Sequence, residues 1–225
     1  MALYLLILLS VLFVATHFAL SHGRLREGLK EKLGQLPFLA VYSLVSIATL
    51  GGAILVFAYH RHEGAWLWST PGWLYPPIYL LMLIAFLFLA LSLANPSPAS
   101  LIPAAMEPRG ILRITRHPMD MGLAAFALAH VIANGFLGDV VFFGSIFVVG
   151  FLGVYHQDRR KAREKGEAYR ALQEKTSIFP FAAIIRGKTT LEPGQFSLPL
   201  ILIAVIAFLV VLFLHQRLFG VAPSP

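Results

Sequence analysis

The sequence has no cysteine and little charge. Without cysteine among its 225 residues, disulfides, thiolate metal ligands, iron–sulfur clusters and cysteine nucleophiles are excluded together. Charged residues make up only 13% of the chain and hydrophobic residues 58%, far from the ~25% charge of soluble domains. Phosphate-binding glycine loops, serine elbows and His-Glu-x-x-His zinc motifs are also missing. These features predict an integral membrane protein.

Apolar runs occupy most of the chain, at residues 2–20, 38–59, 75–94, 121–132, 140–155 and 198–218. Each must satisfy its own backbone inside a bilayer, as a helix does, and spanning ~30 Å of hydrocarbon takes ~20 residues. The fourth and fifth runs are short, so a re-entrant hairpin is an alternative for that pair. We predict an all-α, polytopic membrane helix bundle of about six transmembrane helices, forming a single domain over residues 1–225.

Lysine and arginine alternate between the loops. There are four in residues 21–37, three in 95–116 and nine in 156–197, with one or none in each other loop. Because basic loops stay in the cytoplasm, both termini are predicted outside. The +7 net charge then reflects topology, and no nucleic-acid partner is expected. The highly charged segment near 157–175 predicts a cytoplasmic helix lying at the membrane interface.

Histidines supply most of the ionisable groups within the predicted spans, where such groups are functional candidates. His17 lies in the first span, His130 lies inside the fourth, and His117 opens the fourth. Two neutral imidazoles facing each other across a bundle form an axial pair for haem iron. In the alternative, each imidazole bonds a neighbouring carbonyl and only fixes packing.

A basic segment, Arg113-Ile-Thr-Arg-His-Pro118, precedes the fourth span. Pro118 suits the first turn of a helix, which places His117 near an N-terminus that favours anions. Together with Arg113 and Arg116 it could hold a haem propionate, a carboxylate or a lipid phosphate. Simple anchoring to anionic headgroups is the competing interpretation.

A second polar cluster, Asp158 and Arg159, directly follows the fifth span on the same side. Asp158 is a candidate to pair with an arginine of the other basic loop and close the cytoplasmic face. It could equally be one more solvated charge.

Several strings follow the basic segment in order: Leu128-Ala-His130, Asp158-Arg-Arg160, Gly166-Glu-Ala-Tyr169 and Thr176-Ser177. Together with it they closely resemble the NnrU family. That family includes plant and cyanobacterial 15-cis-zeta-carotene isomerase and bacterial proteins named for a role in denitrification.

The resemblance implies a haem b protein in which two histidines hold the iron, and reduction frees one axial position for a polyene. Matched motif to motif, the catalytic iron ligands fall on His17 and His130, with Arg113, Arg116, His117, Asp158 and Arg159 as cofactor-binding candidates. His130 lies 13 residues beyond His117, or ~20 Å along a helix, whereas His17 is near the cytoplasmic end of its span. His117 is therefore the alternative partner of His17. The isomerases carry a cysteine shortly before the second histidine, which this chain lacks.

The expected function is that of a redox-gated cis-trans isomerase in a bacterial inner membrane, acting on a carotenoid or other isoprenoid with an unidentified electron donor. One alternative is an accessory protein for denitrification. Another is an S-adenosylmethionine-dependent methyltransferase, because Arg-His-Pro followed by a glycine and Gly-Glu-x-Tyr also resembles membrane methyltransferases. Asp120 stands where those enzymes usually carry an aromatic residue, and Asp158-Arg-Arg where they tend to carry paired glutamates.

Overall fold

The computed structural model describes residues 1–21, 23–99 and 106–223. The main helices are α1 (Ala2–Ser21), α2 (Gly23–Leu33), α3 (Gln35–Ser46), α4 (Gly52–Tyr59), α5 (Tyr75–Ala94), α6 (Pro118–Ala133), α7 (Leu137–Lys175), α8 (Ala182–Ile185) and α9 (Leu198–Phe219). In the described residues the only extended pairing is a single bridge between Trp66 and Phe136. The all-α prediction is confirmed.

Five helical segments in the described residues are long and apolar enough to cross a membrane. They are 2–21, 35–59, 72–94, 137–175 and 198–219. The second is one rod, because a π-helical turn at Ile47–Gly51 joins α3 to α4. The remaining apolar helix, α6, has 16 residues, or ~24 Å of length, and is short as predicted. The chain is a polytopic membrane protein.

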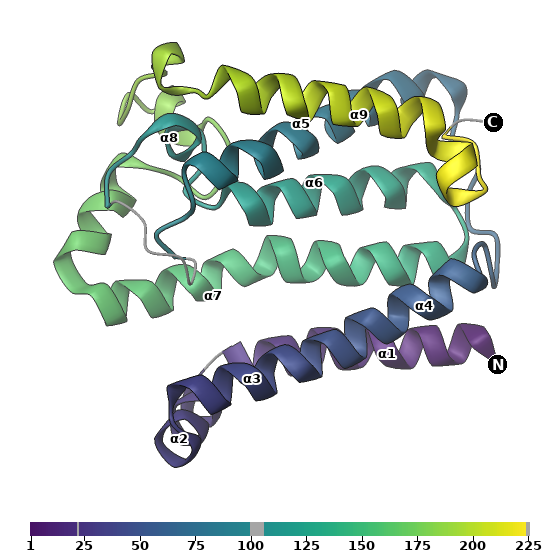
Figure 1. Ribbon diagram of the computed structural model, residues 1–225, viewed down its shortest axis with the longest axis horizontal. Coiled ribbons are helices and arrows are strands. Elements are labelled where there is room, and N and C mark those ends of the chain that lie inside the picture. Colours follow the sequence, from purple (N-terminus) through teal and green to yellow (C-terminus); the bar gives the residue numbers. More distant parts are fainter. Residues whose placement is uncertain (22, 100–105, 224–225) are drawn as a thin grey trace.

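The seventh helix is longer than the sequence indicated. We expected a short span over 140–155 and a separate interfacial helix near 157–175. Instead α7 stays helical from Leu137 past His156, and a kink at Gly166, whose backbone angles are non-helical, separates residues 137–165 from 167–175. Lysine, arginine and glutamate are good helix formers, so the loss of hydrophobicity near His156 ends the apolar stretch without ending the helix. The part of α7 that carries the fifth apolar run lies beside α6 along the bundle (Figure 1), and the number of membrane crossings stays a prediction.

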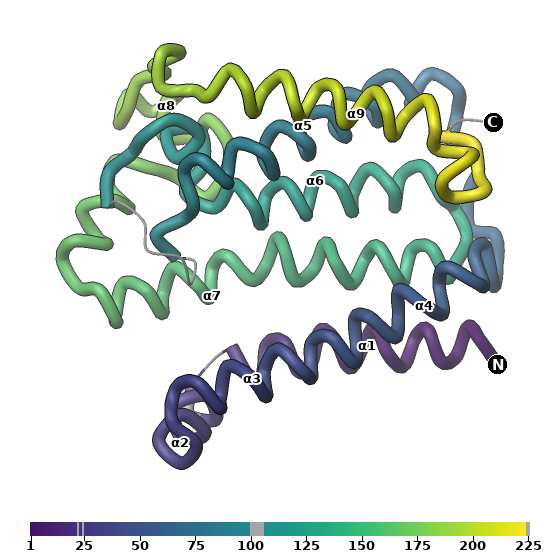
Figure 2. The backbone as a smooth tube through the Cα atoms, in the orientation of Figure 1, coloured from purple at the N-terminus to yellow at the C-terminus, as the bar shows by residue number. Residues whose placement is uncertain are grey.

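The helices lie side by side, with α7 between two groups (Figures 1 and 2). On one side of α7 lie α1, α3 and α4; on the other side α6 packs against both α7 and α5, and α9 packs against α5. Both termini lie at the same end of the bundle. Helix α2, the residues directly before α6 and residues 157–197 lie at the opposite end, which we call the basic end. Its orientation toward the cytoplasm stays a prediction.

Small residues let the central helices approach closely. A Cβ at Gly150 of α7 would lie 3.1 Å from the carbonyl oxygen of Asp120 in α6. A Cβ at Gly122 of α6 would lie 3.2 Å from the carbonyl oxygen of Ala85 in α5. Packing of this kind holds membrane helices together in lipid, where there is little hydrophobic force between them.

Two apolar clusters fill the space around α7. The larger one, at the basic end, joins α5, α6 and α7 and consists of Phe88, Leu91, Ile111, Ile114, Met121 and Val154. The smaller one joins α1, α4 and α7 and consists of Leu6, Ala53, Phe142 and Phe143. The two clusters fix α7 on both sides, so polar groups that α7 carries at the basic end are held in place.

Candidate functional site at the basic end

The motif strings that contain Arg116, His117 and Tyr169 converge on the carboxylate of Asp158. The guanidinium of Arg116 faces it with Nε 2.9 Å from both oxygens, and Nη2 also donates to Oδ2. His117 Nε2 lies 2.8 Å from Oδ1, and the Tyr169 hydroxyl donates to the same oxygen at 2.7 Å. We call Arg116, His117, Asp158 and Tyr169 the Asp158 network.

The Asp158 network is almost completely removed from solvent. The exposed fraction is 5% for Asp158, 7% for Arg116, 1% for Tyr169 and 0% for His117. Buried charges need both a partner and hydrogen bonds to offset their desolvation, and Arg116 Nη1 meets a further acceptor, the Thr176 carbonyl, at 3.1 Å. The prediction that Asp158 pairs with an arginine of the other basic loop is confirmed; the solvated alternative is wrong.

Local backbone contacts set the position of this loop. Pro118 occupies the first turn of α6, as expected, and His117 directly precedes it. The Thr115 hydroxyl donates to the Ile178 carbonyl at 2.6 Å, and the Arg116 amide donates to the Ser177 carbonyl at 3.0 Å. The loop before α6 is therefore tied to the segment after α7, and the Asp158 network closes the basic end.

His117 is placed between two carboxylates. Its Nδ1 lies 3.8 Å from Asp120 Oδ2, too far for a hydrogen bond, and it has no hydrogen-bond partner in the described residues. Complete burial opposes a charged imidazole, but the carboxylates of Asp120 and Asp158 raise the pKa of His117 above its ordinary value. Its Nε2 is already engaged by Asp158 at 2.8 Å, so the geometry does not favour His117 as the alternative haem ligand.

The other predicted anion-binding arginines differ in exposure. Arg113 is engaged within the protein: Nε donates to Gln195, Nη1 to Thr189, and Nη2 lies 2.6 Å from Glu192. Arg159 is exposed on α7. The guanidinium donors of Arg113 and Arg116 are therefore bonded to neighbouring residues, whereas the guanidinium of Arg159 is exposed at the surface.

His17 lies on α1 and faces α3. Its Nδ1 is 3.0 Å from the Tyr42 hydroxyl, which is itself 3.2 Å from the hydroxyl of Ser21. The ring of the next residue, Phe18, lies 5.5 Å from the ring of His156 on α7. Sequence reasoning missed Tyr42, although a hydroxyl inside the apolar run 38–59 was a usable signal.

His130 lies near the far end of α6, away from the basic end. Its Nδ1 is 2.9 Å from the Phe126 carbonyl, and its ring stacks on Phe143 of α7 at 4.4 Å. A histidine whose Nδ1 donates to a carbonyl keeps its Nε2 lone pair for a metal. The same arrangement also serves a histidine that only fixes packing.

The structure does not bring His17 and His130 together. His130 contacts α7 at Phe143, whereas Phe18, beside His17, contacts α7 at His156. These thirteen residues of α7 correspond to ~20 Å. One porphyrin therefore cannot take both imidazoles as axial ligands in this arrangement, and no group of three or more potential metal ligands occurs in the described residues. The role of either histidine in iron binding stays a prediction.

One acidic residue escaped the sequence analysis. Asp139, in the first turn of α7, is 1% exposed, and its Oδ2 lies 3.0 Å from Nδ1 of His62. A carboxylate at the start of a long apolar run was the signal that could have found it.

The fold and the site define a class, namely helical membrane proteins whose basic end is closed by a buried ionic network. The family described as NnrU protein matches residues 5–223, so the chain belongs to the NnrU family. This confirms the resemblance drawn from the motif strings.

Two curated relatives match over most of the chain. The chain is 29% identical over 217 residues to 15-cis-zeta-carotene isomerase, chloroplastic, of Zea mays. The matched region covers 89% of this chain and 57% of that protein. It is 28% identical over 204 residues to the protein of the same name from Arabidopsis thaliana, covering 85% and 53%. The chain thus spans a little over half the length of these relatives. No solved structure matches it.

Proposed function

We propose that this protein is a membrane-embedded cis-trans isomerase of a carotenoid or another long apolar isoprenoid, located in a bacterial inner membrane. The observation that carries the proposal is similarity to two carotene isomerases over 85% or more of the chain. The apolar helices are compatible with a substrate that partitions into lipid.

An apolar groove supports this substrate class. It has a volume of about 290 Å³ and lies between α5 and the end of α6, lined by residues that include Ile78, Leu81 and Ile132. Apolar linings suit apolar ligands. Ile132 and His130 are two residues apart on α6 and so point to different sides of the helix, and the His130 ring packs on Phe143 of α7.

Haem b remains the proposed cofactor, with His17 and His130 as its candidate ligands. His130 fits individually, because its Nδ1 is already bonded to a carbonyl. As a pair on one iron the two histidines do not fit, since His130 contacts α7 at Phe143, whereas Phe18, beside His17, contacts α7 at His156. The isomerase proposal therefore does not depend on a bis-histidine haem, and the electron donor of a redox-gated reaction is left open.

The activity is tested by co-expressing the protein with a supply of 15-cis-zeta-carotene and following the isomer ratio by chromatography. We expect the cis isomer to fall relative to a membrane-inserted control with unrelated apolar spans. An unchanged ratio, with the protein verified in the membrane, contradicts the proposal and favours the accessory role in denitrification.

The cofactor is tested by the absorption spectrum of the protein purified in mild detergent. We expect a Soret band that weakens in His130→Gln and in His17→Gln but not in His60→Gln, a half-exposed histidine at the loop after α4. Loss of the low-spin signal in both variants would mean that the helices move to share one iron. Absence of the band after haem reconstitution rules out the cofactor.

The contacts of Arg116 and His117 do not favour the methyltransferase alternative. It requires Arg116 and His117 to be free for S-adenosylmethionine, but both donate to Asp158.

A further inference from the structure

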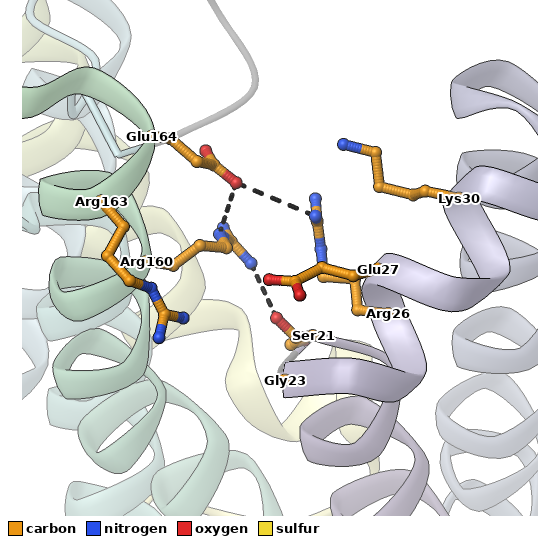
Figure 3. Close-up of a pocket in the computed structure, with 8 residues that line it drawn as sticks. All are labelled: Ser21, Gly23, Arg26, Glu27, Lys30, Arg160, Arg163 and Glu164. Carbon is orange, nitrogen blue, oxygen red and sulfur yellow. Dashed lines mark hydrogen bonds and ion pairs between the residues drawn. The ribbon is translucent and has the colours of Figure 1, made fainter.

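A basic pocket lies where α2 faces the charged part of α7 (Figure 3). Its volume is about 300 Å³. The side chains that matter come from both walls: Arg26, Glu27 and Lys30 from α2, and Arg160, Arg163 and Glu164 from α7. We call this the α2–α7 pocket.

Cations exceed anions in the α2–α7 pocket. One carboxylate, Glu164, is shared by Arg26 at 3.8 Å, Arg160 at 3.7 Å and Lys161 at 2.9 Å. Figure 3 shows Arg26 and Arg160 reaching toward this carboxylate from opposite walls. Neither Lys30 nor Arg163 forms an ion pair within the residues that the structure describes. Four cations against the two carboxylates of Glu27 and Glu164 leave the lining with a net positive charge.

One donor in the pocket wall lacks an acceptor. Arg160 is 17% exposed, and its Nη1 donates to the Ser21 carbonyl at 3.0 Å. Its Nε is buried without a hydrogen-bond partner among the described residues, since Glu164 at 3.7 Å is too distant. A buried donor left unpaired is destabilising, so an acceptor oxygen entering the pocket would relieve it.

The depth of the pocket identifies the class of ligand. It opens beside Ser21, the last residue of the apolar helix α1, which is the level at which a bilayer presents its phosphates. Guanidinium groups match phosphate oxygens in a bidentate geometry. We propose that the α2–α7 pocket binds the phosphate of an anionic phospholipid, which bridges α2 to α7.

The bridging role follows from how α2 is attached. Helix α2 packs mainly against α1 and α3. Its link to α7 is the long ion pair of Arg26 with Glu164. A phosphate between Arg26 and Arg160 would add a second shared anion to Glu164 and so strengthen the attraction between the two walls. Lipid binding should therefore stabilise the whole chain.

The test titrates the detergent-solubilised protein with phosphatidylglycerol or phosphatidylcholine, following lipid adducts by native mass spectrometry and stability by thermal unfolding. The double variant Lys30→Gln/Arg163→Gln removes cations that pair with nothing, so folding should survive. We expect it to bind phosphatidylglycerol about fivefold more weakly for each charge removed.

The matched control is Lys32→Gln/Lys175→Gln, which removes the same charge from exposed positions of α2 and α7 outside the pocket. Equal weakening in both double variants would overturn the pocket, leaving only general electrostatic attraction. Inorganic pyrophosphate in lipid-free detergent is the second arm. Thermal protection by pyrophosphate equal to that by phosphatidylglycerol would overturn the lipid assignment in favour of a soluble phosphate ligand.

Discussion

The two ends of the helix bundle are held together by different interactions. At the basic end, Arg116, Asp158 and Tyr169 come from distant parts of the sequence and form buried ionic hydrogen bonds. At the opposite end, aromatic packing predominates: Phe57 stacks on Phe142 at 4.4 Å, and the ion pair of His62 with Asp139 is partly exposed.

The motif strings therefore fall into two groups by their place in the bundle. Those around Arg116, Asp158 and Tyr169 meet in one network, whose buried ion pair and hydrogen bonds hold the basic end closed. Leu128-Ala-His130 lies at the opposite end, against Phe143. Its histidine has an Nδ1 bonded to the Phe126 carbonyl and takes no part in the Asp158 network.

The largest effect is expected for Asp158→Ala. Removing the carboxylate leaves Arg116 buried without its counter-ion, which should lower the free energy of unfolding by ~3–5 kcal/mol. Equilibrium unfolding in mixed micelles measures the loss. Arg159→Ala, at the exposed neighbouring position, should change it by less than ~0.5 kcal/mol; similar losses in the two variants would mean that the network does not lock the basic end.

A smaller loss is expected for Tyr169→Phe. The substitution removes one hydroxyl that donates to a charged acceptor, and such hydrogen bonds contribute ~1.5–3 kcal/mol. The matched control is Tyr155→Phe on the same helix, because the Tyr155 hydroxyl makes no hydrogen bond within the described residues. Thermal unfolding of both variants gives the comparison, and an unchanged Tyr169→Phe protein would exclude the hydroxyl from the Asp158 network.

Hydropathy predicted the helices well because each apolar run must form its own backbone hydrogen bonds in lipid. The end of α7 was missed because charge ends an apolar run without ending a helix, and the chain stays helical well beyond His156. The pairing of Asp158 with an arginine could be foreseen, since both basic loops lie on one side of the membrane. The identity of that arginine could not be foreseen, because it depends on how the loop before α6 bonds to Ser177 and Ile178.

The order of the motifs does not fix the relative depth of the two candidate haem ligands. It selects His17 and His130, but the depth of each histidine in the bundle depends on where its helix begins. The sequence already placed His130 ~20 Å beyond His117, and the contacts with α7 retain that separation from His17. Tyr42 and the α2–α7 pocket needed the contacts of α1 with α3 and α7, which no local pattern encodes.

A graded effect is expected from pH. The pKa of His117 is raised by its carboxylate neighbours, so its protonated form stabilises the fold. That contribution is complete below the ordinary value of 6.5 and is lost as pH rises through the higher folded pKa. Unfolding measured across this range should show stability falling with pH in the native protein and a flatter profile in His117→Gln. A His215→Gln protein should keep the native slope; a native slope in His117→Gln would contradict the assignment.

The smallest effect is expected at the opposite end, for His62→Ala. The His62 side chain is 34% exposed, and pairs of this exposure contribute little, about 1 kcal/mol or less. Asp139 also lies in the first turn of α7, where the helix dipole favours its negative charge without His62. Equilibrium unfolding in the same micelles should therefore place His62→Ala near the native protein and far from Asp158→Ala. A loss as large as that of Asp158→Ala would show that a buried carboxylate locks each end, and the contrast between them would disappear.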